Sequence, residues 1–207
     1  NPGTGDTLDG TDGFTADIAP PVVVFSDTTS NDTTPALTGT VDDPTATVVV
    51  TVGGVDYTAT NNGDGTWTLP DDTLPALPDG DHVVVVTATD PAGNTDTDTG
   101  TLTIDTTGPT LSITATDMTL ADGEATTVTF QFSEAVTGFI AGDVSVAGGV
   151  LSGFTQVDAD TWTATFTQDG SATAPSISVA DGTFTDLAGN PGTGDTLDGT
   201  DGFTADI

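Results

Sequence analysis

Hydrophobic and polar residues alternate in short runs along the chain, most regularly in its second half. Val128, Phe130 and Phe132 occupy every second position of one run, and Trp162, Ala164 and Phe166 do the same in another. A period of two is typical of a β-strand with one buried face. Gly, Pro, Asn and Asp bound these runs, as they bound strands in sheet proteins. The pattern predicts an all-β protein without long helices.

The first half contains enough short strands for one sandwich. The candidate strands are 22–25, 36–41, 46–52, 55–59, 66–69, 82–89 and 97–104. Gly53-Gly54 separates two of them and predicts a two-residue hairpin, because both positions can take a positive φ. In the second half the residues expected to face inward are Leu111, Ile113, Ala115, Val128, Phe130, Phe132, Trp162, Ala164, Phe166, Ile177, Val179, Phe203, Ala205 and Ile207.

An internal repeat sets the organisation of the chain. The segment NPGTGDTLDGTDGFTADI stands at residues 1–18 and again, unchanged, at 190–207, which gives a period of 189 residues. Repeats of this kind indicate a tandem array. Residues 1–18 are then expected to be the last loop and strand of a preceding repeat. Because the chain begins inside this motif and shows no signal peptide, we expect it to be part of a longer protein.

Two Pro-containing junctions divide the period. ADIAPP at residues 16–21 precedes the first set of strands, and IDTTGPT at 104–110 precedes the second. We therefore predict two domains, 19–105 and 106–207. The expected fold class is all-β, with two immunoglobulin-like (Ig-like) antiparallel β-sandwiches in tandem, arranged end to end.

The charge of the chain excludes several functions. It has no Lys or Arg, 32 acidic residues and a formal net charge of −32. Nucleic acids and anionic membrane surfaces are excluded as partners because both need cationic groups on the protein. Only two of the acids are Glu, and Asp is the residue that suits turns and short metal-binding loops. With no cysteine, disulfides cannot stabilise these small domains.

Carboxylates are expected to converge at each junction, because the linker and two loops of an Ig-like sandwich meet at one end. Close carboxylates repel one another, and Ca²⁺ accepts the oxygen ligands that they offer. Transition metals are disfavoured by the absence of thiols and the single His. The alternative is that DPAGN and DLAGN are only tight turns. The candidate ligands are Asp17, Asp42, Asp43, Asp90 and Asn94 at the first junction, and Asp105, Glu134, Asp186 and Asn190 at the second.

A further acidic stretch, GDTLDGTDG, places Asp195, Asp198 and Asp201 three residues apart in a Gly-rich segment, and its first copy carries Asp6, Asp9 and Asp12. It is either a second calcium loop or an ordinary solvated loop. It lacks the GGxGxD pattern of the calcium β-roll and the final Glu of an EF-hand loop. Asp206, the repeat equivalent of Asp17, completes the candidate ligands.

Several motifs resemble those of bacterial Ig-like repeats. They are SNDTTPALTGTV and TATDPAGNTDTDTGTLTID in the first half, DTTGPT in the linker that follows it, and LADGEATTVTFQFSEAVTGF and VADGTFTDLAGN in the second half. The resemblance covers nearly the whole chain. It implies an extender segment of a giant calcium-dependent adhesin of the repeats-in-toxin or biofilm-associated type. Such a segment is secreted or held at the bacterial cell surface, and its partners are neighbouring repeats of the same chain.

An enzyme is not expected. The single His82 begins a strand, no nucleophile elbow accompanies any Ser, and nothing in the sequence selects two of the many acidic residues as a glycosidase pair.

The leading hypothesis is a calcium-stiffened spacer. The alternative is an Ig-like module that binds a glycan or a protein through an exposed loop, such as 138–149 or 190–202. A repeated copy favours the spacer over a single specific site.

Overall fold

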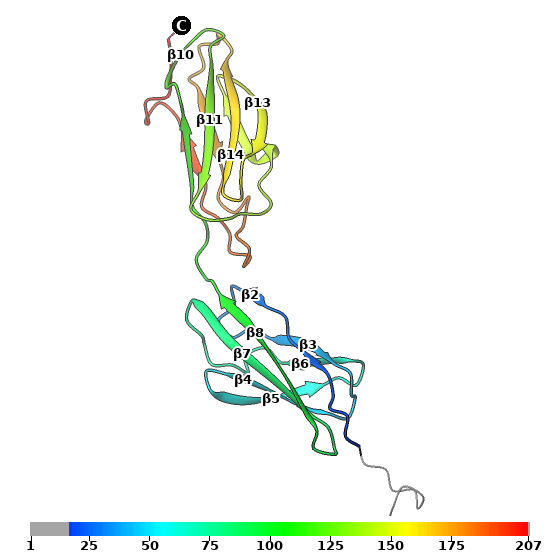
Figure 1. Cartoon of the computed structure of the whole chain (residues 1–207). Helices are drawn as coiled ribbons and strands as arrows, with labels where there is room; N and C mark the ends of the chain where they lie inside the picture. The colour runs from blue at the N-terminus through cyan, green and yellow to red at the C-terminus, as the bar shows by residue number, and fades with distance from the viewer. Residues whose placement is uncertain (1–16, 207) are drawn as a thin grey trace, which may run out of the picture. The chain divides into compact units, whose positions relative to one another are not determined.

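The structure is a computed structural model that describes residues 17–206, so the prediction for residues 1–16 lies outside the described part of the chain. Two compact units are present, each built from strands (Figure 1). The first consists of residues 17–28 and Thr33–Thr103, and the second of Thr29–Asp32 and 104–206. The predicted all-β class is confirmed. Among the described residues only Ala141–Asp143 is helical, and that is one short 3-10 turn.

The first unit is a sandwich, and all of its strands except β2 agree with the predicted ranges to within a few residues; β2 was not predicted. Hydrogen bonds connect its strands in the order β1-β3-β6-β5-β4-β7-β8-β2. The strand β5 links the two layers, because it pairs with β4 along most of its length and with β6 at its end. Gly53 and Gly54, with φ of 60° and 80°, make the predicted hairpin turn. The strands are β1 (Val23–Val24), β2 (Thr28–Ser30), β3 (Leu37–Val41), β4 (Thr47–Val52), β5 (Val55–Asn61), β6 (Thr66–Leu69), β7 (Gly80–Thr89) and β8 (Thr95–Ile104).

The second unit has a four-stranded sheet, β13-β14-β11-β9, and a three-stranded sheet, β12-β15-β16. A further pair, β10 with β17, is parallel. The strands are β9 (Leu111–Ala115), β10 (Thr119–Ala121), β11 (Ala125–Phe132), β12 (Val144–Ala147), β13 (Gly149–Gln156), β14 (Thr161–Gln168), β15 (Ser176–Val179), β16 (Asp195–Leu197) and β17 (Thr204–Asp206).

The core of the second unit is rich in aromatic rings. The predicted inward positions are buried there, apart from Ala115 and Ala205, which are half-buried, and Ile207, which lies outside the described residues. Phe139 packs edge-on against both Phe132 and Trp162, at centroid distances of 5.0 and 5.5 Å. Such pairs add about 0.5–1.5 kcal/mol each beyond the area they bury.

Aspartate side chains join the start of each unit to one of its last strands, β8 in the first unit and β16 in the second. Asp96 and Asp98 on β8 accept hydrogen bonds from the backbone N–H groups of Val23 and Phe25, at 3.0 and 2.8 Å. In the second unit Asp195 accepts from the N–H of Ile113 at 2.7 Å. These carboxylates take the place of ladder carbonyls, and they satisfy N–H groups that would otherwise be costly to bury.

Candidate metal centre

Three carboxylates of the second unit gather where three of its segments meet. One carboxylate oxygen from each of Asp105, Glu134 and Asp186 lies within 4.8 Å of the other two. Asp105 directly follows β8 in the linker, Glu134 lies two residues after β11, and Asp186 begins the DLAGN loop. Among the described residues this is the one group of three such side chains close enough to hold a metal ion.

Hydrogen bonds within the DLAGN loop hold both carboxylate oxygens of Asp186 in place. The Oδ1 atom of Asp186 accepts hydrogen bonds from the N–H groups of Gly189 and Asn190, at 2.7 and 2.8 Å. Gly189 permits this turn with a φ of 94°. The side-chain amide of Asn190 donates to Asp186 Oδ2 at 2.7 Å and to the carbonyl of Asp105 at 2.8 Å. Asn190 therefore connects the loop to the linker, and its amide orients the other two residues.

A rigid base supports the centre. Phe132 and Phe184 each stand two residues before a carboxylate of the cluster, and their rings pack edge-on at 4.7 Å. Ser133 holds the linker, because it accepts a hydrogen bond from the N–H of Thr110 at its Oγ and donates its own N–H to the carbonyl of Thr110. The alternating pattern of the sequence placed Phe132 in the core but did not single out Phe184 or Ser133.

The cluster is electrostatically strained without a cation. Burial, followed by the charges of Asp105 and Asp186, raises the pKa of Glu134 above its ordinary value. Unit charges about 4 Å apart repel by about 1 kcal/mol in water and about 4 kcal/mol at the dielectric of a protein surface. The chain has no Lys or Arg to neutralise the cluster. A proton on Glu134 or a bound cation would relieve this repulsion.

The donor set fits a hard divalent cation. All three side chains offer carboxylate oxygens, and Asp186 is 2 % exposed, so its charge is largely withdrawn from water. Ca²⁺ takes six to eight oxygen ligands in flexible geometry, with water completing the shell, whereas zinc and copper sites favour imidazole or thiolate. The residues present therefore fit calcium.

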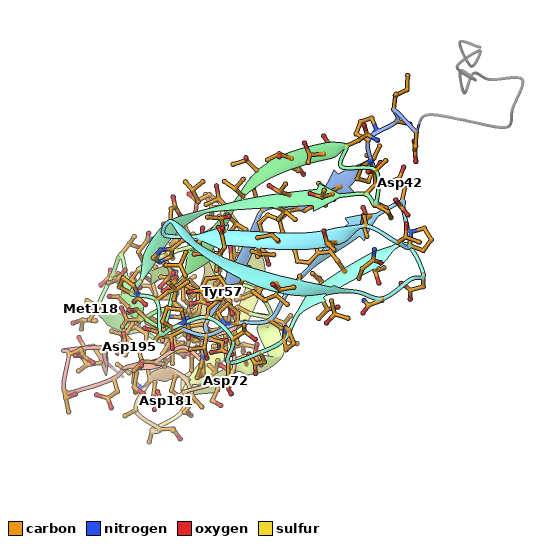
Figure 2. All side chains as sticks on the ribbon, turned by 90° about the horizontal axis from the view of Figure 1, so that it is seen from below. Asp42, Tyr57, Asp72, Met118, Asp181 and Asp195 are labelled. Atoms are coloured by element: carbon orange, nitrogen blue, oxygen red, sulfur yellow. The ribbon has the colours of Figure 1, made fainter. Side chains whose placement is uncertain are left out.

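The first unit repeats the turn but not the cluster. Asp90 and Asn94 make the same hydrogen bonds as their counterparts, and the amide of Asn94 donates to the carbonyl of Asp17 at 3.1 Å. The hydrogen bond from Asn94 lowers the pKa of Asp90, although burial opposes it. Asp42 and Asp43 instead accept bonds from the N–H groups of Val22 and Thr45. Figure 2 shows Asp42 at the end of this unit, beside the segment that leads into β1.

The acidic stretch near the C-terminus forms local hydrogen bonds within the second unit. Asp198 accepts from the N–H and the hydroxyl of Thr200, both at 2.8 Å, and these bonds lower its pKa. Asp201 accepts from the N–H of Asp198, and Asp206 lies exposed on β17. Asp195 accepts the hydrogen bond from the N–H of Ile113 in β9. Among the described residues, no three of these four carboxylates lie close enough together to hold a metal ion.

The comparisons with known proteins concern both units. A family model described as a bacterial Ig-like domain matches residues 105–201, and a second model with the same description matches residues 23–106. No curated protein matches the chain.

Among solved structures, matches that cover most of this chain include three proteins. One is from work on a 1.5-MDa bacterial ice-binding adhesin (21% identity, TM-score 0.42, 91% of this chain and 66% of that chain). Another is the Escherichia coli adhesin FdeC (17%, 0.42, 89% and 65%). The third is a tetra-tandem repeat in the extending region of a large adhesion protein (22%, 0.36, 90% and 49%). This chain thus spans about two thirds or less of each of the three.

The two matches together run from residue 23 to residue 201, and both fall on all-β units. The chain therefore consists of two tandem bacterial Ig-like domains of two different types.

Proposed function

We propose that this chain is a calcium-stiffened extender segment of a large bacterial adhesin, placed outside the cell or on its surface and supporting adhesion and biofilm formation. The observation that carries the proposal is the cluster of Asp105, Glu134 and Asp186, three carboxylates in a chain without Lys or Arg. Calcium bound there joins the linker, through Asp105, to two loops of the second domain. The linker then loses freedom when the ion binds.

The repeat supports a spacer rather than a single recognition site. Two copies of an identical segment 189 residues apart belong to an array in which each unit contacts its neighbours. Extracellular calcium modules have dissociation constants of about 10⁻⁴ to 10⁻³ M, which suits a site that fills outside the cell. The described residues include no helix long and apolar enough to cross a bilayer.

The loops considered for ligand binding are more regular than the sequence indicated. Within 138–149 the structure forms β12, which pairs with β15, and Phe139 is buried in the aromatic core. Within 190–202 it forms β16. Both segments therefore offer fewer exposed loop residues for ligand binding than the sequence predicted. The spacer is the better supported function.

Calcium titration tests the proposal. An ion that binds only the folded state stabilises it by RT ln(1 + [L]/Kd), which is about 1.4–2.7 kcal/mol at 10 mM calcium for the affinities above. We expect the melting temperature of the second domain to rise by several degrees. Sodium chloride at equal ionic strength controls for screening of the net charge, and magnesium tests selectivity. Equal melting in calcium and in chelator would rule out the calcium role.

A further inference from the structure

Carboxylate side chains, rather than backbone carbonyls, join the first strand of the first domain to its last. The strand β1 pairs through its backbone with β3, whereas β8 lies between β7 and β2. Side-chain bonds span the remaining seam, between residues 23–27 and β8. The donor N–H groups belong to Val23, Phe25 and Thr101, and the acceptors are Asp96, Asp98 and Asp27, at 3.0, 2.8 and 2.7 Å.

The two sides of this seam run in the same direction. The bonded residues lie 73, 73 and 74 positions apart, so the residue numbers rise together along both segments. Gly100 permits the close approach, because a Cβ atom there would lie 2.7 Å from the ring of Phe25 and 3.1 Å from the carboxylate of Asp27. The seam is therefore a parallel contact bridged by carboxylates.

The second domain closes in the same parallel sense, but mainly through backbone groups. Thr110 and Thr193 form a parallel bridge, in which Thr193 donates its N–H to the carbonyl of Pro109 and accepts the N–H of Leu111. Farther along the chain, β10 and β17 also pair in parallel. Asp195 adds one carboxylate bond to β9.

Parallel first and last strands decide how each domain meets tension along the chain. Tension draws the first strand toward its N-terminal end and the last strand toward its C-terminal end, so the two strands are pulled past each other. The bonds across the seam are then stretched together, in shear, instead of breaking one after another. Forced unfolding is governed by the unfolding rate, which depends on the bonds that must break before the barrier is crossed.

We propose that these seams carry the load when the chain is stretched, and that in the first domain carboxylates transmit it between β8 and β1. An N–H bond to a carboxylate is shorter and stronger than a bond between neutral groups, so a few of them take the place of a backbone ladder. The chain has no Lys or Arg to compete for these carboxylates. The inference concerns each domain by itself and depends neither on calcium nor on a role in adhesion.

Single-molecule stretching of the whole chain tests the proposal. The chain has no cysteine, so a Cys added at each end gives defined attachment points. In chelator, the first domain of Asp96→Ala/Asp98→Ala should unfold at a lower force, with its rate at constant force rising about tenfold for each bond lost. The second domain of the same molecules is the internal reference and should unfold as in the parent.

Two milder variants separate the loss of a bond from damage to the fold. Asp96→Asn/Asp98→Asn keeps side-chain oxygens that can accept the same N–H groups, and it should retain most of the resistance to force. Asp27→Ala removes an exposed acceptor, and water can take its place at the N–H of Thr101. This variant should therefore fold normally and yet unfold about tenfold faster under tension.

The direction of pulling distinguishes a load-bearing seam from a general loss of stability. Attachment at Val55 and Asp64, two exposed residues near the ends of β5, directs the tension through β5 and leaves β1 and β8 outside its path. In this geometry we expect the Ala variants to unfold at nearly the rate of the parent. An equal acceleration in both geometries, or parent-like unfolding of Asp27→Ala when it is stretched from its ends, would overturn the proposal.

Discussion

Glu134 shows at the scale of one residue how the candidate centre couples charge to stability. Its raised pKa means that the folded state binds a proton more tightly than the unfolded chain does. In the absence of a cation, the stability of the second domain is therefore expected to fall as pH rises from the ordinary value of 4.5 through the raised one. A bound cation reverses this preference, because it needs the ionised carboxylate.

Replacing Glu134 with Gln should consequently have opposite effects in the two conditions. In chelator at pH 7 it removes two repulsive pairs, and we expect the melting temperature to rise by a few degrees, at about 1 kcal/mol per pair. In calcium it removes a ligand, and the melting temperature should fall below that of the parent. Glu124→Gln, at the only other Glu, is the control and should respond equally in both conditions. A shift of the same sign in chelator and in calcium would contradict this account of the cluster.

The sequence predicted the members of the centre, but not which junction would gather them. The motifs DPAGN and DLAGN predicted equivalent turns, and both form the same hydrogen bonds. What differs is the third segment, because Glu134 lies on a loop held beside the linker by Ser133, whereas Asp42 and Asp43 bond to nearby backbone groups. Short acidic side chains find local donors easily, and local patterns do not reveal which donors lie near.

At the scale of elements, the carboxylates that join first and last strands are the feature least visible in the sequence. The alternation TDTDT in β8 is typical of a strand with one polar face, yet Asp96 and Asp98 accept hydrogen bonds from backbone N–H groups 73 residues away in the chain. Periodicity predicts which face a residue occupies, but not which distant edge lies opposite. The strands and their buried faces could be predicted because each follows a local period of two.

Replacing Asp98 with Ala should destabilise the first domain. The N–H of Phe25, a residue 5 % exposed, would lose its acceptor, at a cost of about 1–3 kcal/mol. Asp98→Asn should cost much less, because the amide oxygen can still accept that bond. Asp56→Ala, which removes only an exposed bond from the hydroxyl of Thr51, is the control. Urea unfolding in chelator measures all three, and equal midpoints for the Ala and Asn variants would argue against a strand-joining role.

At the scale of the whole molecule, Asp105 is the residue through which calcium would act on the connection between domains. It follows β8 directly, its carboxylate belongs to the cluster, and its carbonyl accepts the amide of Asn190. Between Asp105 and β9 lie only five residues, ending in Pro109 and Thr110. Gly108 in this segment approaches the carbonyl of Pro191 so closely that a side chain there would collide with it.

We predict that Asp105→Ala frees this linker without unfolding either domain, because the side chain lies outside both cores. In calcium, the small-angle scattering profile of the variant should match that of the parent in chelator, with a broader distribution of interatomic distances and unchanged β-sheet circular dichroism. Asp17→Ala removes the equivalent residue before the first domain and should leave the profile of the parent in calcium unchanged. If Pro109 and direct packing already set the linker, Asp105→Ala will scatter like the parent in calcium, and the ion then stabilises the second domain without stiffening the chain.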